Sequence, residues 1–338
     1  MRKPRVTSVD VARHAGVSQS AVSRALAPGG RGVSEALRAR VRASAEALGY
    51  RPNAHARSLI SGRSRIVGVL FSYLDNPFYA DALERLCAAL QAEGYHAMVF
   101  LEPETTQNVR RTVLDLMDYR VDGIITASVE LSSALCDECR AFGIPVVMLN
   151  RLRDDPRLSA VTTDNVLGGR LAARHLLGIG RARPAILAGW EGASTSRDRE
   201  WGFGAELRDA GVALHAREVG HFDLPRAAEA TRRLFGGAGE RPDALFAAND
   251  YMALRALSVL RHELGLRVPQ DVAVVGFDDV AQAAAPEYDL TTLTQPVARM
   301  VAHAVRILLA EVGGAEPERL VLTPSLVRRG STGGQTGG

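Results

Sequence analysis

The feature that most constrains the fold is an alternation of short apolar strands with amphipathic helices that begins at Ile66. A first series predicts strands at 66–70, 96–101, 123–126 and 146–149, with a helix at 78–93. A second series predicts strands at 184–188, 219–222, 244–247 and 272–277, each followed or preceded by a helix. Repeated strand–helix–strand units form parallel sheets that are covered on both faces. Two series therefore predict a two-lobed, doubly wound α/β domain with a ligand site at the carboxyl ends of its strands.

Polar and aromatic side chains follow several of these predicted strands: Asn76, Phe78, Tyr79, Asn150, Arg151, Asn249 and Asp278, with Arg199 near the start of a helix. Fixed Arg, Asn and Asp groups around aromatic rings suit a small polyhydroxylated ligand. Strand ends also hold purely structural groups, and for Trp190 and Phe222 both interpretations stay open. Asp250 and Asp279 are interpreted as helix-cap or hinge groups.

The first 65 residues differ from the rest of the chain in charge. They contain 13 Lys and Arg residues against three acidic residues, a net charge of +10, whereas the remainder carries −7 and the whole chain +3. A basic head on an acidic body is expected where one end of a protein meets a polyanion. A solvated basic tail would lack apolar periodicity, and this head has it, so we expect a folded module that binds nucleic acid.

The head has the pattern of two short helices joined by a glycine turn. Thr7 is a good N-cap with Asp10 placed to complete a capping box, and Gly16 ends the helix. Ser18 caps a second helix over 19–26, a helix-turn-helix arrangement whose second helix lies in the major groove. Its outward side chains suit the reading of base edges; they are Gln19, Ser20, Ser23 and Arg24. A third helix capped by Ser34 follows, and Asn53 can cap a short fourth one.

Residues 7–12, 15–18, 22–26, 33–34 and 50–53 together resemble the N-terminal region of the lactose-repressor/galactose-repressor (LacI/GalR) family. The resemblance implies that Gln19, Ser20 and Arg24 read bases while Thr7, Ser18 and Ser23 anchor phosphates. It also implies a hinge helix at 53–61 that enters the minor groove as a dimer, with Leu59 as a wedge beside Ala56. Ala27-Pro28 stand where the family usually has Asn, in a loop one residue longer, with Arg31 as a substitute phosphate contact.

The body resembles the family's effector domain, which is similar to periplasmic sugar-binding proteins, so the resemblance covers about residues 5 to 330. It implies effector contacts from Asn76, Phe78, Tyr79, Asn150, Arg151, Arg199, Asn249, Asp278 and Gln295, with Phe222 and Trp190 stacking on the ligand. Asn150 stands where the family commonly has Asp. The missing carboxylate leaves Arg151 and Arg199 less neutralised, which permits an acidic effector without requiring one.

The predicted fold class is an all-α helix-turn-helix head plus an α/β two-lobed, periplasmic-binding-protein-like sensor domain. The predicted limits are 1–52 for the DNA-binding domain, 53–65 for the hinge and 66–330 for the effector domain. Its N-lobe spans about 66–162 and 296–323, and its C-lobe about 163–295 and 324–330. Residues 331–338 are rich in Gly, Thr and Ser and are expected to form a disordered tail.

The expected function is that of a homodimeric transcriptional repressor that binds a pseudo-palindromic operator in double-stranded DNA. A small sugar, sugar acid or related carboxylate would control it allosterically. An extracytoplasmic sugar-binding protein is the second class, against which stand the basic head and the absence of an export signal. With no membrane-length apolar run, we expect a cytoplasmic, nucleoid-associated protein.

An enzyme is the third class, and the sequence speaks against it. No P-loop or G-x-S-x-G elbow occurs, and His262-Glu263 lacks the second His of a zinc protease motif. The cysteines are Cys87, Cys136 and Cys139, an odd and low number that argues for reduced thiols. Cys136 and Cys139 have no second pair to complete a zinc site. We therefore expect no catalytic residues, no metal and no cofactor.

Overall fold

A computed structural model describes residues 6–26, 32–50, 63–101, 106–128, 131–152, 155 and 157–333, without the side chains of residues 106–108. The chain divides into two compact units between Arg65 and Ile66, and each unit is described by itself. The predicted hinge helix with Asn53, Ala56 and Leu59, and the loop with Ala27, Pro28 and Arg31, lie outside the described residues.

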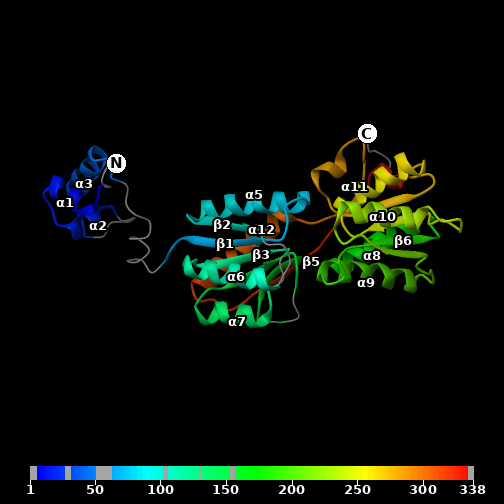
Figure 1. Cartoon of the computed structure of the whole chain (residues 1–338), viewed down its shortest axis with the longest axis horizontal. Helices are drawn as coiled ribbons and strands as arrows, with labels where there is room; N and C mark the ends of the chain where they lie inside the picture. The colour runs from blue at the N-terminus through cyan, green and yellow to red at the C-terminus, as the bar shows by residue number, and fades with distance from the viewer. Residues whose placement is uncertain are drawn as a thin grey trace. The chain divides into compact units, whose positions relative to one another are not determined.

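The first unit contains the helices α1 (Ser8–Ala15), α2 (Gln19–Leu26) and α3 (Glu35–Ala47), drawn in blue in Figure 1. Thr7 and Asp10 form the predicted capping box, and Gly16 ends α1 in the left-handed conformation at φ 63°. Ser34 caps α3, since its hydroxyl accepts a hydrogen bond from Leu37 N at 3.3 Å. Caps of this kind stabilise a helix by about 1 kcal/mol each. The three helices bury one small core: Val11, Ala12, Ala15, Val22, Ala25, Val41 and Ala45.

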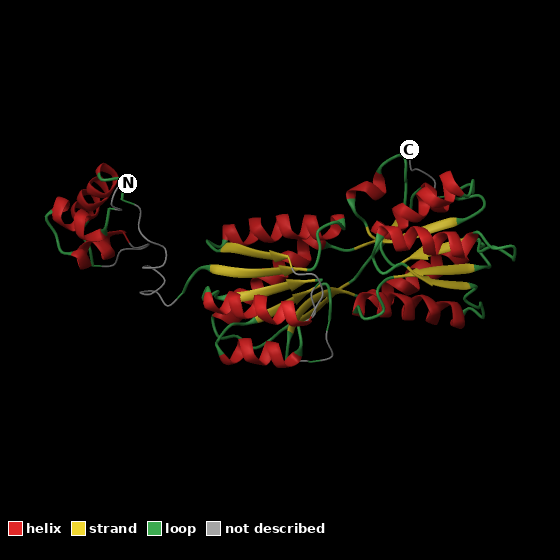
Figure 2. Ribbon diagram, in the orientation of Figure 1, coloured by secondary structure: helices red, strands yellow, loops and turns green. Residues whose placement is uncertain are grey.

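The second unit, the body, contains two sheets (Figure 2). In its described residues the first sheet has the strand order β11-β5-β4-β3-β1-β2, with every pairing parallel. Its strands are β1 (Ile66–Phe71), β2 (His96–Leu101), β3 (Gly123–Ala127), β4 (Val146–Leu149), β5 (Ser159–Thr163) and β11 (Arg319–Leu322). One face is covered by α5 (Pro77–Ala92) and α12 (Val297–Val312), the other by α6 (Thr106–Asp118) and α7 (Ser133–Ala141). We call this the N-lobe.

The second sheet has the order β12-β10-β9-β8-β6-β7 and is parallel except for the pairing of β12 with β10. Its strands are β6 (Pro184–Ala188), β7 (Ala216–Val219), β8 (Ala244–Ala247), β9 (Ala273–Asp278), β10 (Thr291–Thr294) and β12 (Leu326–Val327). Helices α10 (Leu224–Phe235) and α11 (Asp250–Ser258) cover one face, and α8 (Asn165–Gly178) and α9 (Ser194–Asp209) cover the other. We call this the C-lobe.

The chain passes between the two sheets three times. The first crossing (162–165) leads from β5 to α8, the second (294–296) from β10 to α12, and the third (323–325) from β11 to β12. The second and third crossings are joined directly, because Thr294 N donates to Ser325 O at 2.7 Å and the two hydroxyls lie 2.9 Å apart. The domain limits stated from the sequence stay a prediction.

The structure contains four strands that the sequence analysis did not predict, β5, β10, β11 and β12, and it differs from two predictions that were made. No strand spans 219–222: β7 ends at Val219, and His221 and Phe222 adopt left-handed backbone angles of 57° and 58°. The disordered tail does not begin at residue 331, because Ser331 and Thr332 are buried in a short 3-10 turn. Ser331 Oγ donates to Val274 O at 2.7 Å and accepts from Thr291 N at 2.8 Å. Residues 334–338 lie outside the described residues.

The helices that the structure describes include none that combines the length and the apolarity of a membrane span. Cys136 and Cys139 are buried in α7. Burial raises the pKa of the Cys139 thiol to about 11, so this thiol is protonated at neutral pH. It is therefore a poor nucleophile and a poor metal ligand.

Candidate functional site

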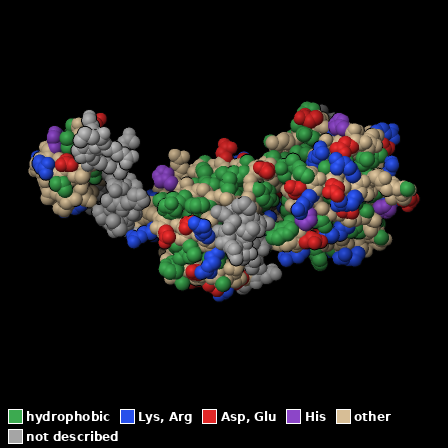
Figure 3. Space-filling model, viewed as in Figure 1, with side chains coloured by type: hydrophobic (Ala, Val, Ile, Leu, Met, Phe, Trp, Pro, Cys, Tyr) green, Lys and Arg blue, Asp and Glu red, His purple; other side chains and the backbone are tan. Residues whose placement is uncertain are grey.

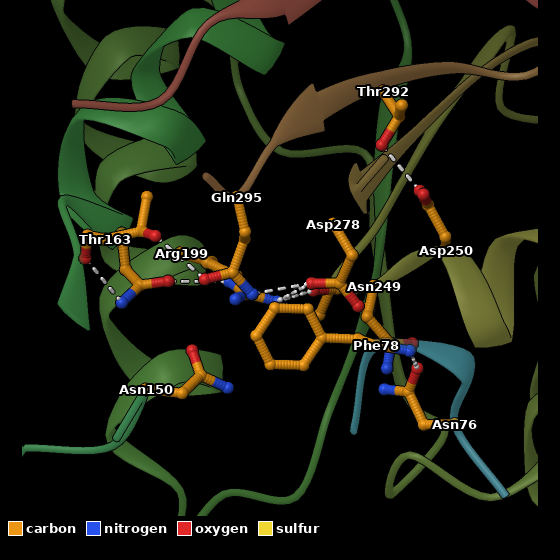
Figure 4. Close-up of polar contacts among 12 residues, drawn as sticks. Asn76, Phe78, Asn150, Thr163, Arg199, Asn249, Asp250, Asp278, Thr292 and Gln295 are labelled. Carbon is orange, nitrogen blue, oxygen red and sulfur yellow. Dashed lines mark hydrogen bonds and ion pairs between the residues drawn. The ribbon is translucent and has the colours of Figure 1, made fainter. Parts of the chain in front are cut away.

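Apart from Trp190, the side chains predicted to contact an effector are buried, and they come from both lobes. Most of them converge in Figure 4, where Arg199, Asp278 and Gln295 lie close together beside Phe78. Strand ends and helix starts bring them there. The full set is Asn76, Phe78, Tyr79, Asn150, Arg151, Arg199, Phe222, Asn249, Asp278 and Gln295.

Arg199 projects from α9 and is the largest fully buried side chain of the described residues. Its Nε donates to Asn165 Oδ1 at 2.8 Å, and its Nη1 donates to Ala248 O at 2.6 Å. The guanidinium carbon lies 3.7 Å from the centre of the Phe277 ring, a close cation–π contact. Burial lowers the pKa of Arg199, but an arginine starts so high that it keeps its charge. The remaining nitrogen, Nη2, is buried and has no hydrogen-bond partner.

Asp278 ends β9 and faces Arg199, with 3.6 Å between Oδ1 and Nη1. The same oxygen accepts a hydrogen bond from Gln295 Nε2 at 2.8 Å. Burial raises the pKa of Asp278 to about 6, while Arg199 and hydrogen bonds from Gln295 and Asn76 act in the opposite direction. The carboxyl group is therefore predominantly ionised at neutral pH and neutralises Arg199.

Asp250 is fully buried at the start of α11, and both of its carboxylate oxygens are bonded within the protein. Oδ2 accepts from Val280 N at 3.0 Å and Oδ1 from Thr292 Oγ1 at 2.5 Å. A Cβ on Gly276 would lie 2.1 Å from Oδ1, so this carboxylate requires glycine beneath it. Burial and the neighbouring Asp278 raise the pKa of Asp250 to about 7. This geometry supports the interpretation of Asp250 as a structural group. Asp279 pairs instead with Arg329 at 2.7 Å.

Two asparagines that follow strands act as helix caps. Asn76 Oδ1 accepts from Phe78 N at 3.0 Å at the start of α5. Asn249 Oδ1 accepts from Met252 N at 3.0 Å at the start of α11. In each case the side-chain oxygen is used by the backbone and the amide nitrogen remains for other contacts. Asn76, in the N-lobe, also helps to hold down the pKa of the Asp278 carboxyl group in the C-lobe.

Asn150 follows β4 in the left-handed conformation, at φ 74°, which asparagine tolerates better than most residues. Its Nδ2 donates to Tyr79 Oη at 3.2 Å, and Tyr79 packs edge-on against Phe78 with 5.2 Å between ring centres. Asn150 Oδ1 is buried and has no hydrogen-bond partner. Arg199 Nη2 and Asn150 Oδ1 are thus a buried donor and a buried acceptor, both unpaired. A hydroxylated ligand would satisfy the two, since a hydroxyl accepts and donates.

Trp190 lies near Arg151, and Phe222 packs on Gly189. A Cβ on Gly189 would fall 2.1 Å from a carbon of the Phe222 ring. Trp190 is half-buried, and the Arg151 guanidinium lies 5.5 Å from the centre of its ring. Stacking of either ring on a ligand stays a prediction. Sequence reasoning missed Thr163 and Asn165, whose side chains contact Gln295 and Arg199, because the strand before them was not predicted.

In the head, the predicted base-reading side chains of α2 are exposed. Gln19 Nε2 donates to Ser8 Oγ at 3.0 Å, the hydroxyls of Ser18 and Ser20 lie 2.9 Å apart, and Arg24 Nε donates weakly to Ser20 O at 3.4 Å. Ser23 is exposed beside them, and the Thr7 hydroxyl is occupied by Asp10 at 2.7 Å. Their roles in DNA binding stay predictions. Across the described residues, no three His, Cys, Asp or Glu side chains gather as a metal site would require.

Comparison with family models gives two matches. Residues 8–53 match the bacterial regulatory proteins of the lacI family, and residues 155–332 match a periplasmic binding protein-like domain. The chain is 33% identical to the ribose operon repressor of Escherichia coli (strain K12) over 330 residues, which is 96% of this chain and 99% of the relative. It is 31% identical to the HTH-type transcriptional repressor PurR of Aliivibrio fischeri (strain MJ11) over 331 residues, 96% of this chain and 98% of the relative.

Solved structures agree with these matches. The Lac repressor dimer bound to operator and the anti-inducer ONPF superposes with a TM-score of 0.88 at 29% identity, covering 97% of this chain and 99% of that chain. The complex of the transcriptional regulator CelR with cellobiose gives a TM-score of 0.73 at 32% identity, covering 97% and 100%. The family and the fold class predicted from the sequence are confirmed, and the family is one of regulators and not of enzymes. The chain therefore belongs to the LacI family of transcriptional repressors, with a helix-turn-helix DNA-binding head and a periplasmic-binding-protein-like effector domain.

Proposed function

We propose that this repressor binds a pseudo-palindromic operator as a homodimer and that a small sugar or sugar acid, held between the two lobes, controls that binding. The observation that carries the effector part is the pair of unpaired buried atoms, Arg199 Nη2 and Asn150 Oδ1. Each would cost about 1–3 kcal/mol if left without a partner. A hydroxylated ligand supplies a partner to both.

The chemistry around these two atoms fits a hydroxyl-rich ligand. Asp278 offers a carboxylate and Gln295 an amide, and Phe78 and Tyr79 supply apolar ring surface. Asn150, Arg151, Asn249, Asn76 and Phe222 complete the proposed contacts. Sugar-binding sites combine polar groups of this kind with aromatic faces. The solved relative CelR is in complex with cellobiose, which supports the sugar class for this chain.

The balance of cations and anions in the site determines which effector charge it favours. Arg151 and Arg199 are buried, and Asp278 is the carboxylate that faces Arg199. Asn150 adds no negative charge. A sugar carboxylate therefore meets one negative charge fewer here than it would if residue 150 were an aspartate.

The DNA part of the proposal assigns base reading to Gln19, Ser20 and Arg24 and phosphate anchoring to Thr7, Ser18 and Ser23. Asn53, Ala56 and Leu59 are assigned to a hinge that enters the minor groove. The solved Lac repressor is a dimer bound to operator, which supports a two-fold complex. A repressor acts on chromosomal DNA, so we place the protein in the cytoplasm at the nucleoid.

Control by the effector requires two states of the body with different affinities for the ligand and for DNA. The crossings are the segments whose backbone must turn when the lobes change their relative orientation. A ligand that bonds Arg199 in the C-lobe and Asn150 in the N-lobe favours one orientation over the other, and through it one state of the head.

A thermal-shift screen of the full-length chain tests the effector site. We expect one of D-ribose, cellobiose, D-galactose and D-gluconate to raise the melting temperature, since a ligand at 100 times its Kd stabilises a fold by about 2.7 kcal/mol. Arg199→Gln should abolish the shift, and Trp201→Ala, at an exposed position of the same helix, should retain it. A shift that survives Arg199→Gln unchanged would place the ligand elsewhere.

A second experiment tests the DNA part. The full-length protein should retain particular genomic fragments against an excess of bulk competitor DNA at physiological ionic strength. The retained fragments should share a two-fold repeat with half-sites roughly one helical turn apart. Retention no better than that of the competitor, with and without the sugar panel, would contradict the proposal.

A further inference from the structure

A closed ring of buried polar contacts joins the proposed effector site to the crossings (Figure 4). Thr163 Oγ1 donates to Gln295 Oε1 at 2.8 Å, and Gln295 Nε2 donates to Asp278 Oδ1 at 2.8 Å. Asp278 Oδ1 faces Arg199 Nη1 at 3.6 Å. Arg199 Nε donates to Asn165 Oδ1 at 2.8 Å, and Asn165 Nδ2 returns to Thr163 O at 2.9 Å. All five side chains are buried, so solvent does not weaken these bonds.

The ring brings together parts of the chain that are far apart in sequence. Thr163 and Asn165 belong to the first crossing and Gln295 to the second, so the bond between Thr163 and Gln295 links two crossings 132 residues apart. Arg199 and Asp278 are site residues of α9 and β9. The ring is thus a direct connection between the ligand site and the segments that join the lobes.

The contact between Arg199 and Asp278 is the loosest in the ring. Its 3.6 Å separation exceeds the roughly 2.7–2.9 Å of a charge-assisted hydrogen bond. The other four contacts measure 2.8 or 2.9 Å. The same guanidinium carries the unpaired Nη2. A ligand oxygen that bonds Arg199 and Asp278 would therefore enter the ring at its longest and weakest contact.

Asn165 is not needed to cap its helix. Asp164 caps α8, because its Oδ1 accepts from Leu167 N at 2.9 Å. The Asn165 amide instead uses its oxygen on Arg199 and its nitrogen on Thr163 and, more weakly, on Thr162 Oγ1 at 3.4 Å. Its side chain is therefore placed by the ring and not by the helix start.

We infer that Asn165 and Thr163 are positioning residues, which orient Arg199 and Gln295 for the ligand and carry a change at the site to the first and second crossings. The inference rests on the proposed effector site, which the sugar screen tests separately. We assign neither residue to direct contact with the ligand. Each acts through one neighbour in the ring. Removing either side chain should therefore change the hydrogen bonds on the far side of the ring.

The first test uses the full-length protein without any ligand and follows the Arg199 Nε–H group by nitrogen-15 NMR, assigned from its disappearance in Arg199→Lys. Asn165→Leu removes the acceptor, so we expect the Arg199 resonance to shift and its hydrogen exchange to speed up by about 2- to 10-fold. Asn165→Asp keeps an acceptor oxygen and should retain slow exchange. An unchanged Arg199 resonance in Asn165→Leu would overturn the inference.

The second test separates positioning from local structure by hydrogen exchange of the backbone. Gln295 N donates to Asp278 O at 3.2 Å on the far side of the ring from Asn165. Asn165→Leu and Thr163→Val should each speed exchange at residues 293–297 by about 2- to 10-fold. Conversely, Asp278→Asn at the site should speed exchange at residues 162–167. A purely local role of either residue would leave the other crossing unchanged.

Thr294→Val is the matched control. It removes a threonine hydroxyl, as Thr163→Val does, but from the second crossing. The bond to Ser325 is lost and every contact of the ring stays in place. The Arg199 resonance should be altered by Thr163→Val and unaltered by Thr294→Val. Equal effects of the two variants would show general loosening of the crossings and would overturn the inference. Because these readouts need neither sugar nor DNA, their failure is distinguishable from failure of the proposed function.

Discussion

Arg24 is exposed on α2 and makes only one weak contact within the described head, to Ser20 O at 3.4 Å. Its guanidinium is therefore free to bond a base edge, and arginine bonds guanine in a bidentate manner. We expect Arg24→Ala to weaken binding to the preferred operator by about 1–3 kcal/mol and to relax the preference at one base pair. The measurement is binding to a set of single-base operator variants selected with the wild-type protein.

Arg42→Ala provides the comparison, because Arg42 is an exposed residue of α3 outside the base-reading helix. We expect Arg42 to contact a DNA phosphate, and the loss of such a contact should weaken all operator variants to the same degree. Sugar-induced thermal shifts should be the same in both proteins and in the wild type. If Arg24→Ala also lowers affinity uniformly, then Arg24 anchors the backbone of the DNA and does not read a base.

Asp250 predicts a specific dependence of stability on pH. Its pKa rises from 3.8 to about 7 on folding because of burial and Asp278. The folded protein thus holds a proton that the unfolded chain releases, and the stability that this provides is full below about pH 4 and is lost as the pH rises through about 7. In Asp250→Asn this loss is absent. Urea unfolding at several pH values should show wild-type stability falling relative to the variant between pH 4 and 8.

The comparison reports on the pair of Asp250 and Asp278, because Asp278 interacts with Asp250 and its titration changes with the substitution, whereas the shifted groups outside this pair are common to both proteins. Burial lowers the pKa of His175 and raises that of Glu311, and these contributions cancel when the two free energies of unfolding are subtracted. Asn can still accept from Val280 N and donate to Thr292, so the fold should tolerate it. Parallel curves for the two proteins would mean that Asp250 is ionised in the folded state.

At the scale of elements, the contact between α8 and α9 determines where Arg199 lies. A Cβ on Gly202 would fall 2.0 Å from Val166 O, and a Cβ on Gly169 would fall 2.1 Å from Arg199 O. Backbone atoms cannot yield as a side chain can, so Gly202→Ala must separate the helices. We expect a loss of about 1–3 kcal/mol in the free energy of unfolding, measured by urea denaturation, and a weaker sugar-induced thermal shift.

Gly204→Ala is the control on the same helix. Its Cβ would meet only the Arg208 Nη1 atom, at 3.2 Å, the far end of a flexible side chain. Alanine is preferred over glycine inside a helix by about 0.5–1 kcal/mol, so this variant should be as stable as the wild type or more stable. Equal destabilisation by both substitutions would contradict the prediction, because Gly204→Ala meets no backbone atom and alanine is the better helix former.

The elements that the sequence predicts well are those with continuous apolar runs. Strands such as β4 and β6 were predicted at their observed limits, because buried parallel strands are apolar on both faces. The missed strands β5 and β10 are rich in Thr. Their hydroxyls are buried by partners far along the chain, such as Gln295 for Thr163 and Asp250 for Thr292. Local periodicity contains no information about such partners.

The candidate site shows the same division. Residues that follow apolar strands, such as Asp278 and Asn150, could be named from the sequence, because the carboxyl ends of parallel strands meet. Asn165 could not, since its role depends on Arg199 and on a crossing whose strand was missed. The prediction that the disordered tail begins at residue 331 failed for a related reason. Ser331 and Thr332 belong to a Gly- and Ser-rich stretch, yet bonds from Thr332 to His175 and Thr291 hold it in the C-lobe.

At the scale of the whole molecule, the two units differ in how they use charge. Figure 3 shows basic side chains interspersed with acidic ones on the visible face of the body. Many basic side chains of the body are paired, as Arg170 is with Glu206 at 3.0 Å and Arg233 with Glu218 at 2.9 Å. Exposed pairs add little stability, about 0–1 kcal/mol each, but they cancel the field around them. The head has 13 basic residues and three acidic ones, so its field is not cancelled in this way.

This difference predicts that operator binding depends steeply on salt while sugar binding does not. A protein that neutralises roughly six to ten phosphates loses roughly a thousandfold to a hundred-thousandfold in affinity between 50 and 200 mM salt. We expect the wild-type protein to lose affinity for its operator within that range, which is measured from the slope of log Kd against log salt. Arg40→Ala with Arg42→Ala, two exposed positions of α3, should reduce the slope by about two.

Arg208→Ala tests whether the slope belongs to the head. Arg208 is an exposed arginine of α9 in the body, and its loss changes the net charge of the chain by the same amount as one head substitution. If counterions are released where the head meets the phosphates, this variant keeps the wild-type slope. If Arg208→Ala and Arg42→Ala reduced the salt slope equally, the affinity for DNA would depend on the total charge of the chain. The basic head would then not be the part that binds.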